Sequence, residues 1–482
     1  MKFLKGLLSV YRPDFPKVVV YMLQSTEYDT ADYLAWLWRV FDFGKVMHRR
    51  TLVPTKPARM LLLAMRLGIL AQALLGVFLA YRSLHVHHST VGLVISILFI
   101  LSAPIVWAHL IVAPLIAGRW FITKPSNWRQ IREAEKIFAN HPGVRIAIAG
   151  SYGKTTMKEI LLSVLSEGKK VAATPANRNV ASSHAEFAAS LKGDEEILLI
   201  EYGEGAPGDV RRFCVNTHPN MGIITGLAPA HLDKYKTLKS AGEDIFSLAD
   251  YLNDQDVYVN GENDALKPFL KKGHVRYTSE KVDGWRVSDI RVSMQGTKFK
   301  MTKGSLVLNL SSALIGRHLV APMALAAYLA DEAGLTKQQI EKGVANIKPF
   351  EHRMQARELH GAWLIDDTYN GNIEGMEAGL KLLAELPAKR KVYVTPGLVD
   401  QGAETENIHI RLGRAIAAAK PDVVVLMKHS VTDYIEMGIR SADYAGQLII
   451  NDDPLDFYNN LDKFVAAGDL VLMQNDWPDN YA

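Results

Sequence analysis

A glycine-rich stretch near residue 150 contains residue types that bind phosphate. It follows a run of small and apolar residues and precedes a helical pattern. A helix that begins after such a turn directs backbone N–H groups and the positive end of its dipole at an anion. A lysine there reaches terminal phosphates, and a threonine hydroxyl binds Mg²⁺. The generic loop has a glycine where this chain has Ile148, so three interpretations are open: a chance turn, a damaged loop, or a shorter version belonging to one family. The candidate nucleotide-binding residues of the stretch are Gly150, Ser151, Tyr152, Gly153, Lys154, Thr155 and Thr156.

The composition narrows the class of protein. The chain has 482 residues, which is too long for one ordinary core and predicts two or three domains. Its 55 basic and 51 acidic residues nearly balance and are dispersed, which argues against a nucleic-acid partner. Cys214 is the single cysteine, so an intramolecular disulfide framework is excluded and a reducing compartment is favoured. The group His85, His87 and His88 is interpreted as loop histidines beside a membrane rather than as a metal site.

Two apolar stretches precede the glycine-rich segment. Residues Val91 to Ala117 have no Asp, Glu, Lys or Arg and are long enough to cross a bilayer of about 30 Å. Leu61 to Tyr81 is a weaker candidate because Arg66 and Gln72 interrupt it. A buried core hairpin is the alternative. The pattern favours a two-helix transmembrane hairpin over residues 60–118.

The distribution of basic residues predicts the orientation of this hairpin. Basic side chains flank both spans, whereas the short connecting loop has only Arg82. By the positive-inside rule both ends face the cytoplasm, so we expect a multi-pass protein of the cell membrane with its catalytic domains in the cytoplasm. The flanking basic residues are Lys45, Arg49, Arg50, Lys56 and Arg59 on one side and Arg119, Lys124, Arg129 and Arg132 on the other.

The regions around the hairpin have distinct patterns. Residues 1–59 are amphipathic and rich in aromatic side chains, and the sequence leaves open whether they lie on the membrane surface or pack on the catalytic domains. Residues 119–142 are expected to form a linker helix. From residue 143 onward, short buried strands alternate with helices, which predicts a central nucleotide-binding α/β domain at 143–348. A change to alternating polarity near residues 286–310 indicates a small antiparallel insert. A second, doubly wound α/β domain is expected at 349–482.

Several segments after the hairpin resemble the Mur ligase family. "GSYGKTT" resembles the family's shortened phosphate loop, and "TPANRN" resembles the Thr-Pro-x-Asn-x-Asn segment of its D-alanyl-D-alanine-adding (MurF) class. "IEYGEGAPGDV", "ITGLAPAHLDKY" and "LIDDTYNGNIEGM" resemble further motifs of that class, in the same order, over about residues 144–469. The resemblance favours a family-specific loop over a damaged one. It implies a central P-loop domain followed by a Rossmann-like carboxy-terminal domain.

The resemblance also implies a reaction and roles for named residues. ATP phosphorylates a substrate carboxylate, an amine attacks the acyl phosphate, and an amide forms with release of ADP and phosphate. The implied catalytic residues are Lys154, His231 and Arg353. ATP is expected to bind the glycine-rich loop together with Arg353, Asp366, Asp367, Tyr369, Asn370 and Asn372. Thr155, Glu201 and His231 would hold Mg²⁺, and Thr174, Asn177 and Asn179 would contact the acceptor. Lys158 and Glu159 are expected to form a solvated helix face.

The chain departs from the family pattern at several places. The usual first domain, which grips the uridine diphosphate of the soluble precursor, is replaced by the hairpin segment. The family's His-Asn-x-x-Asn reads His318-Leu-Val-Ala-Pro322, so adenine needs other contacts. The lysine that Mur ligases commonly carbamylate aligns with Gly242. We expect Asp244 to supply the missing anionic oxygen to Mg²⁺, with Glu243 less favoured and Lys239 a rival in another register.

Three functions compete at this point. The first is a membrane-anchored, ATP-dependent ligase of peptidoglycan synthesis that adds D-alanyl-D-alanine or a similar amine to a soluble or lipid-linked muramoyl peptide. The second is a Mur-like ligase that makes a polyglutamate-type polymer or amidates a lipid-linked precursor; the single cysteine argues against the zinc-ribbon version of that enzyme. The third is a non-catalytic membrane scaffold that only binds nucleotide, against which Lys154, Glu201 and His231 argue.

Overall fold

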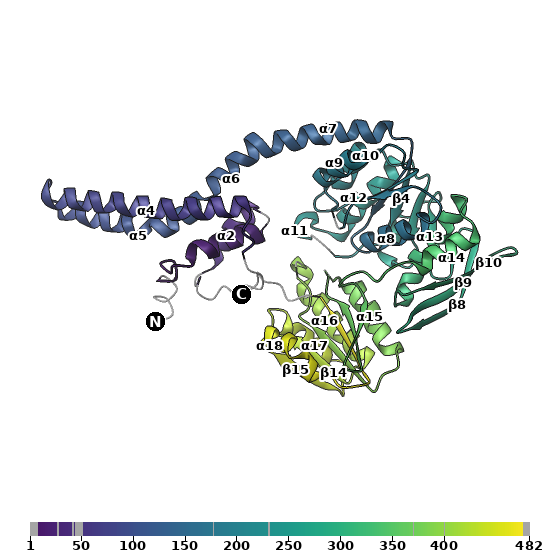
Figure 1. Cartoon of the computed structure of the whole chain (residues 1–482). Helices are drawn as coiled ribbons and strands as arrows, with labels where there is room; N and C mark the ends of the chain where they lie inside the picture. Colours follow the sequence, from purple (N-terminus) through teal and green to yellow (C-terminus); the bar gives the residue numbers. More distant parts are fainter. Residues whose placement is uncertain are drawn as a thin grey trace. The chain divides into compact units, whose positions relative to one another are not determined.

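The computed structural model describes residues 8–26, 28–40, 43, 52–176, 178–229, 232–369, 371–399 and 401–475. The chain divides into two compact units, with the boundary between Trp128 and Arg129. The smaller unit is helical, and the larger unit contains two β-sheets flanked by helices (Figure 1).

The smaller unit is built on a helical hairpin. Thr55 and Ser89 begin its two long helices, because their side-chain oxygens accept hydrogen bonds from the backbone N–H groups of Ala58 and Gly92. These helices pack side by side (Figure 1). The described helices of this unit are α2 (Phe15–Ser25), α3 (Thr30–Arg39), α4 (Lys56–His85), α5 (Thr90–Leu110) and α6 (Val112–Gly118).

Small and polar residues form the contact between α4 and α5. A Cβ atom on Gly68 would lie 2.4 Å from the ring of Trp107, so only glycine admits this close approach. The side-chain amide of Gln72 donates to the carbonyl of Phe99 at 2.8 Å and to the hydroxyl of Ser102 at 3.2 Å. The polar residue that interrupts the first apolar stretch is therefore satisfied inside the hairpin.

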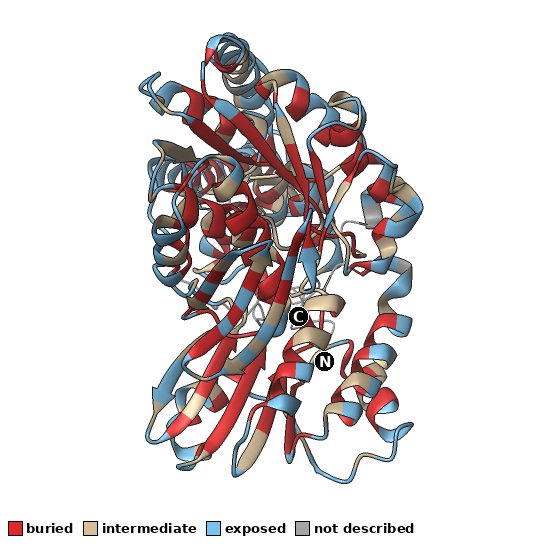
Figure 2. Ribbon diagram, turned by 90° about the vertical axis from the view of Figure 1, so that its right-hand side faces the viewer, coloured by how far each residue is buried: buried red, intermediate tan, exposed pale blue. Residues whose placement is uncertain are grey.

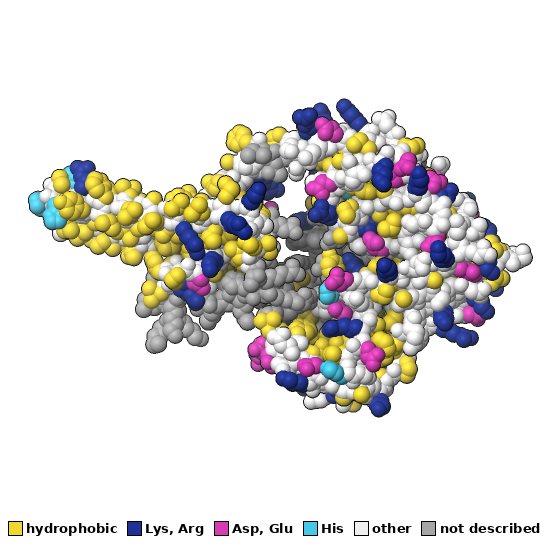
Figure 3. All heavy atoms as spheres, in the orientation of Figure 1, with side chains coloured by type: hydrophobic (Ala, Val, Ile, Leu, Met, Phe, Trp, Pro, Cys, Tyr) yellow, Lys and Arg dark blue, Asp and Glu magenta, His cyan; other side chains and the backbone are white. Residues whose placement is uncertain are grey.

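The outer surface of the hairpin is apolar. Hydrophobic side chains cover the face visible in Figure 3. Both α4 and the helix that begins at Thr90 are long and apolar enough to cross a membrane, by length and composition. The arrangement, with polar groups inside and apolar groups outside, inverts the usual pattern of a water-soluble helix pair. The exposed apolar residues include Leu63, Leu67, Leu70, Leu74, Val77, Phe78, Val91, Val94, Ile95, Leu98 and Leu101.

The amino-terminal helices pack on one end of this hairpin. Val19 and Leu23 of α2 are fully buried in a cluster that also contains Leu61 and Met65 of α4. The hydroxyl of Tyr33 in α3 donates to the carbonyl of Ala108 at 2.8 Å. The sequence left open where this amino-terminal segment packs. In the structure its buried side chains pack against the hairpin.

Helix α7 (Lys124–Asn140) follows the hairpin after a π-helical turn (Arg119–Thr123). It crosses the boundary between the two units. Its carboxy-terminal half belongs to the larger unit, where Phe138 is fully buried among residues of the central domain.

The central domain has one mixed, 10-stranded sheet with the order β10-β9-β8-β7-β6-β5-β4-β1-β3-β2. β1 is central and pairs in parallel with β3 and β4. The sequence predicted an antiparallel insert, and β8, β9 and β10 form it as an extension of the same sheet. The strands are β1 (Val144–Ala149), β2 (Val171–Ala173), β3 (Ile197–Glu201), β4 (Met221–Ile224), β5 (Val257–Asn260), β6 (Val275–Tyr277), β7 (Lys281–Val282), β8 (Trp285–Ser293), β9 (Gly296–Lys303) and β10 (Leu306–Ser312).

Helices cover both faces of this sheet. Because side chains alternate along a strand, Ile146 and Ile148 of β1 face one layer while Ala147 and Ala149 face the other. One layer contains α8 (Lys154–Leu165), α13 (Val320–Glu332) and α14 (Lys337–Ala345). The other contains α9 (Ala181–Ser190), α10 (Asp209–Thr217) and α12 (Leu238–Tyr251). The remaining short helices are α11 (Leu232–Tyr235) and the 3₁₀ turns Asp264–Phe269 and Arg317–Leu319.

The carboxy-terminal domain has a second mixed sheet of six strands in the order β11-β12-β16-β13-β14-β15. β11 (Gln355–Leu359) is antiparallel to β12 (Ala362–Asp367), and the other pairs are parallel. The parallel strands are completed by β13 (Arg390–Thr395), β14 (Val423–Met427), β15 (Gln447–Asn451) and β16 (Asp469–Gln474). The fold is thus α/β with mixed sheets, and the antiparallel β11 was not predicted.

Helices also cover both faces of the second sheet. Val424 belongs to the layer with α15 (Ile373–Glu385), α16 (Thr405–Ala419) and α17 (Thr432–Arg440). Val425, the next residue, belongs to the layer with α18 (Pro454–Asn459) and α19 (Leu461–Phe464). A 3₁₀ turn, Gly402–Glu404, precedes α16. Buried residues therefore concentrate on the strands, and the helices are exposed on their outer sides (Figure 2).

Candidate active site

The glycine-rich stretch forms a tight turn between β1 and α8. Gly150 has φ 141° and Gly153 has φ 75°, conformations that favour glycine. A Cβ atom on Gly150 would lie 2.4 Å from the hydroxyl oxygen of Thr225. Two bonds attach the turn to the end of β4: Ser151 N–H donates to the Gly226 carbonyl at 2.9 Å, and the Thr225 hydroxyl donates to the Tyr152 carbonyl. The turn is therefore held in one conformation at the amino terminus of α8.

Lys154 does not extend freely from this turn. Its ammonium group donates to the carbonyl of Gly150 and lies 2.6 Å from Oε2 of Glu204. The two side chains of this ion pair are only 12% and 4% exposed. Glu204 lies in the loop after β3, next to the strand that carries the glycine-rich turn. The sequence interpretation missed Glu204, although its position three residues after Glu201 placed it at the same edge of the sheet.

Glu201 ends β3 and is a centre of polar contacts. Its Oε1 accepts hydrogen bonds from the Thr155 hydroxyl at 3.0 Å and from the Asn179 amide at 3.3 Å. Its backbone N–H donates to the Thr174 hydroxyl at 3.1 Å. The structure therefore brings together Thr155, Glu201, Thr174 and Asn179, whereas Asn177 lies outside the described residues.

Lys158 corrects the expectation of a solvated helix face. The side chain is fully buried, and its ammonium group lies 3.2 Å from Oε2 of Glu201. It also donates to the carbonyl of Ala176. The expectation failed because the segment around Ala176, which is distant in sequence, covers this face of α8. Glu159, which is 32% exposed, lies 3.6 Å from the same ammonium group.

Two aspartates end β12 on the carboxy-terminal domain. The carboxylate of Asp367 accepts from the Gln474 amide at 2.8 Å and from the Met354 N–H at 3.2 Å, and burial raises its pKa to about 6. Asp366 accepts from the ring of His352 at 2.9 Å and does not line the cavity described next.

Arg353 acts electrostatically on Asp367, and Asn372 begins the helix that follows β12. The guanidinium group of Arg353 lies 4.4 Å from the ring centre of Tyr369. The side chain of Asn372 caps α15 by accepting from the Gly375 N–H at 2.9 Å. Asn370 lies outside the described residues.

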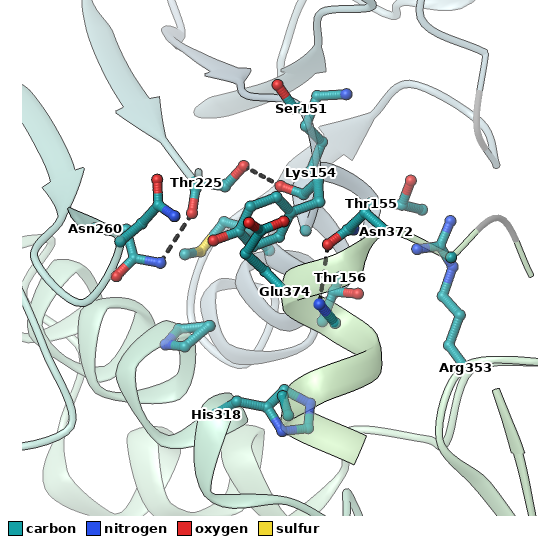
Figure 4. A pocket seen from close by; sticks show the side chains of 18 of the residues that line it. Ser151, Lys154, Thr155, Thr156, Thr225, Asn260, His318, Arg353, Asn372 and Glu374 are labelled. Atoms are coloured by element: carbon teal, nitrogen blue, oxygen red, sulfur yellow. Dashed lines mark hydrogen bonds between the residues drawn. The ribbon is translucent and has the colours of Figure 1, made fainter. Parts of the chain in front are cut away.

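A cavity of about 1220 Å³ is lined by residues of both domains of the larger unit. Lys154 and Thr155 of α8 line it from the central domain, and Asn372 and Glu374, at the start of α15, line it from the carboxy-terminal domain; Figure 4 shows these side chains together with Arg353. Its volume exceeds the range of about 300–1,000 Å³ typical of a single small ligand. Its lining includes Ser151, Tyr152, Gly153, Lys154, Thr155, Thr156, Asn179, Glu201, Glu204, Thr225, Asn260, His318, Arg353, Asp367, Tyr369, Asn372 and Glu374.

A charged cluster on the carboxy-terminal wall was also missed from the sequence. Arg411 of α16 makes a two-pronged ion pair with Glu377, at 2.7 and 2.8 Å, and lies 3.5 Å from Glu374. All three residues line the cavity. They come from two different helices, so no local pattern linked them.

Comparison with known proteins assigns this arrangement to a family. Residues 148–330 match the Mur ligase middle domain, and residues 352–474 match the Mur ligase glutamate ligase domain. This chain belongs to the Mur ligase family. The family resemblance of the sequence motifs is thereby confirmed.

Curated relatives of this Mur ligase include UDP-N-acetylmuramoyl-tripeptide–D-alanyl-D-alanine ligases. That of Escherichia coli (strain K12) is 29% identical over 321 residues, which cover 63% of this chain and 69% of the relative. That of Treponema pallidum (strain Nichols) is 28% identical over 280 residues, which cover 57% of this chain and 60% of the relative. The matched part thus spans between three fifths and seven tenths of these relatives.

Solved structures show the same fold. MurF ligase from Thermotoga maritima in complex with ADP has a TM-score of 0.64 and 22% identity, covering 74% of this chain and 82% of that one. MurF from Acinetobacter baumannii has a TM-score of 0.62 and 19% identity, covering 72% of this chain and 77% of that one.

The candidate metal ligands of this Mur ligase are only partly described. Thr155 and Glu201 lie together at the loop, and His231 lies outside the described residues. Within the described ranges, no group of three or more His, Cys, Asp or Glu side chains is arranged to hold a metal ion. The oxygen donors present suit Mg²⁺, since the buried carboxylate of Glu201 has Oε1 3.0 Å from the Thr155 hydroxyl, while its Oε2 pairs with the Lys158 ammonium at 3.2 Å.

Both carboxylate oxygens of Asp244 are engaged by neighbouring groups, which argues against its expected role as a metal ligand. Its two oxygens accept hydrogen bonds from the Gly208 N–H and the Tyr235 hydroxyl, both at 2.8 Å, and burial raises its pKa. It is not among the residues that line the cavity. Asp244 thus anchors the turn before α10, while Glu204 is the additional carboxylate beside the glycine-rich loop.

His318, the remaining part of the family's His-Asn-x-x-Asn pattern, lines the cavity together with Pro322 and Asn260. Asn260 is held in place because its amide donates to the Thr225 carbonyl at 2.9 Å. The two asparagines of the family pattern are replaced by Leu319 and Pro322 here, and the amides that line the cavity include those of Asn260 and Asn263.

Proposed function

We propose that this Mur ligase is an ATP-dependent, ADP-forming ligase that joins D-alanyl-D-alanine or a similar amine to a muramoyl peptide during peptidoglycan synthesis. The observation that carries the proposal is the convergence of Lys154, Thr155 and Glu201 in one cavity with Arg353 of the other domain. The names of the curated relatives and the ADP-bound fold neighbour support the substrates and the nucleotide.

The residues of the glycine-rich loop suit phosphate binding. The loop N–H groups, the positive end of the α8 dipole and the Lys154 ammonium present positive charge to one place. Thr155 and Glu201 would hold Mg²⁺, which when bound neutralises phosphate charge during phosphoryl transfer. Arg353 adds a positive charge from the carboxy-terminal domain, so both domains would contact ATP.

The chemistry requires two substrates besides ATP in the same cavity. In the first step a carboxylate oxygen of the muramoyl peptide takes the terminal phosphoryl group, and ADP leaves. In the second step the neutral amine attacks the acyl carbon, the C–O bond to phosphate breaks, and the amine loses a proton. Alignment of the reacting groups contributes most in such transfers. The volume of the cavity accommodates a nucleotide together with both reacting ends.

The carboxy-terminal wall suits a zwitterionic amine. Glu374 and Glu377 offer negative charge to an ammonium group, and Arg411 offers a guanidinium group to a carboxylate. A dipeptide such as D-alanyl-D-alanine carries both charges. We therefore place the amine substrate on this side and assign Asn179, which lines the cavity, to the acceptor. Thr174 is buried and does not line the cavity, so it would act through its bond to Glu201.

The smaller unit is proposed to anchor the enzyme in the cell membrane with its catalytic domains in the cytoplasm. The support is the apolar outer surface of α4 and α5, the internal hydrogen bonds of Gln72 and the basic residues that flank both helices. A membrane anchor in place of a nucleotide-gripping domain favours a lipid-linked acceptor as a second candidate substrate beside the soluble precursor.

The proposal is tested with purified full-length protein in detergent or nanodiscs. ADP release is measured with ATP, Mg²⁺ and a soluble or lipid-linked muramoyl tripeptide, with and without D-alanyl-D-alanine. We expect ADP release that requires both acceptor and amine, and that is lost in Lys154→Ala. ADP release with a lipid-linked acceptor and ammonia would favour amidation, and no turnover with any pair would favour a scaffold.

A further inference from the structure

Lys158 is a fully buried cation that pairs with Glu201 but does not itself line the cavity, and neither the motifs nor the proposed reaction uses it. It lies one helical turn after Lys154 on α8. Taking a lysine out of water is costly unless it is paired and hydrogen-bonded. Two acceptors meet this requirement: Oε2 of Glu201 at 3.2 Å and the backbone carbonyl of Ala176.

The contact with Glu201 distinguishes the two carboxylate oxygens. Oε1 faces the Thr155 hydroxyl and the Asn179 amide, whereas Oε2 accepts no hydrogen bond from described side chains and has Lys158 as its ion partner. The side chain of Glu201 is only 2% exposed, so the orientation of its carboxylate depends on these contacts rather than on water. Lys158 thus holds Oε2, and Oε1 remains on the side of Thr155.

The contact with Ala176 connects the same ammonium group to the neighbouring segment. Ala176 has φ 45°, a left-handed conformation that is unfavourable for a residue with a Cβ atom. Thr174 and Asn179, on either side of it, both bond to Glu201. One buried cation therefore holds both the carboxylate and the strained turn of the segment assigned to the acceptor.

We propose that Lys158 is a positioning residue that orients Glu201 toward the metal and couples Ala176, which lies between Thr174 and Asn179, to it. The inference rests on the proposed function, since it takes Thr155 and Glu201 as metal ligands. Lys158 acts through Glu201 and does not itself contact nucleotide. Its removal would allow the carboxylate to rotate and would release the turn at Ala176.

The test measures nucleotide affinity of the full-length protein with and without Mg²⁺. In Lys158→Met, which keeps the length of the side chain and removes its charge, we expect the Mg²⁺-dependent gain in ADP affinity to fall about tenfold or more. Affinity for metal-free ADP should change less than threefold. Lys342→Met is the matched control, because Lys342 pairs with Glu167 at 2.8 Å outside the cavity.

A double variant separates positioning from a purely structural role. Lys158→Met alone leaves a buried, unpaired carboxylate, whereas Lys158→Met with Glu201→Gln removes both charges. If Lys158 acts through Glu201, the lysine substitution has no further effect on the Mg²⁺-dependent gain in the Glu201→Gln background. An equal effect in both backgrounds would overturn the proposal.

Two other outcomes also contradict it. A lower melting temperature for Lys158→Met with an unchanged Mg²⁺-dependent gain would show that the lysine only stabilises the fold, and the proposed function would stand. If the wild-type protein shows no Mg²⁺-dependent gain at all, the assignment of the metal ligands fails, and the positioning role fails with it.

Discussion

The ion pair between Lys154 and Glu204 predicts that Glu204→Gln tightens nucleotide binding in the absence of metal. The ammonium and carboxylate groups lie 2.6 Å apart with side-chain exposures of 12% and 4%, so water screens them little. Lys154 is the group expected to contact phosphate, and Glu204 therefore competes with phosphate for it. Glutamine keeps the shape of the side chain and removes its negative charge.

The size of the effect follows from the geometry. Two unit charges about 4 Å apart interact by about 4 kcal/mol at an effective dielectric constant of about 20. Only part of this interaction energy becomes available to an incoming phosphate in Glu204→Gln, because Lys154 keeps its bond to the Gly150 carbonyl and the glutamine oxygen remains a weak acceptor for Lys154. We expect a net gain of about 1.4 kcal/mol, or about tenfold in the dissociation constant of metal-free ADP.

Equilibrium binding of a fluorescent ADP analogue in EDTA measures this gain. Glu167→Gln is the control, because it removes a carboxylate that pairs with Lys342 at 2.8 Å outside the cavity. The unpaired Lys154 should also lower the free energy of unfolding by about 1–3 kcal/mol, less than the loss for a fully buried pair. Unchanged or weaker metal-free ADP binding in Glu204→Gln would refute the competition between Glu204 and phosphate.

Three further predictions follow from other contacts. Asp244→Asn should lower the melting temperature and leave the Mg²⁺ concentration for half-maximal ADP binding unchanged, because the carboxylate holds the Gly208 N–H and the Tyr235 hydroxyl; a shifted Mg²⁺ titration would restore Asp244 as a ligand. The carboxy-terminal domain should lose stability as the pH falls below 6.5. Burial lowers the pKa of His409 in the folded protein, where its Nε2 accepts a hydrogen bond from the Leu398 N–H at 2.9 Å. As the pH falls, the unfolded chain therefore binds a proton at this histidine before the folded protein does, which favours unfolding. His409→Gln should flatten that dependence in thermal melts. Deletion of residues 1–118 should give a protein that stays in the supernatant after ultracentrifugation and binds ADP, since the larger unit has its own cores; sedimentation of a folded product would contradict the anchor.

Much of the fold was predictable because the chain alternates short apolar strands with amphipathic helices. The glycine-rich loop follows β1 and Glu201 ends β3, and parallel neighbouring strands bring their carboxyl ends to one edge of the sheet. The family resemblance implied that Glu201 lies beside Thr155, and this pairing of parallel strands is the physical reason. The two long helices of the hairpin were also predictable, since an apolar stretch of about 20 residues or more is typical of a membrane-spanning helix.

The errors arose where long-range packing decides the environment of a side chain. Lys158 has the sequence context of an exposed helix position, and only the fold places Ala176 over it. Asp244 lies at the expected place in sequence, but α12 directs it toward Gly208 rather than toward the cavity. Glu204 lies in an irregular loop, where neither the helical nor the strand repeat of the sequence predicts which way a side chain points. In each case the deciding contact joins residues far apart in sequence.

The most direct test of the central claim is the mass of the product formed by the purified full-length enzyme from ATP, Mg²⁺, a muramoyl tripeptide and D-alanyl-D-alanine. The account predicts a muramoyl pentapeptide with one ADP released per amide bond, and no product from Lys154→Ala. ADP release that does not depend on the acceptor and the amine, or the absence of an amide product with both soluble and lipid-linked acceptors, would contradict it.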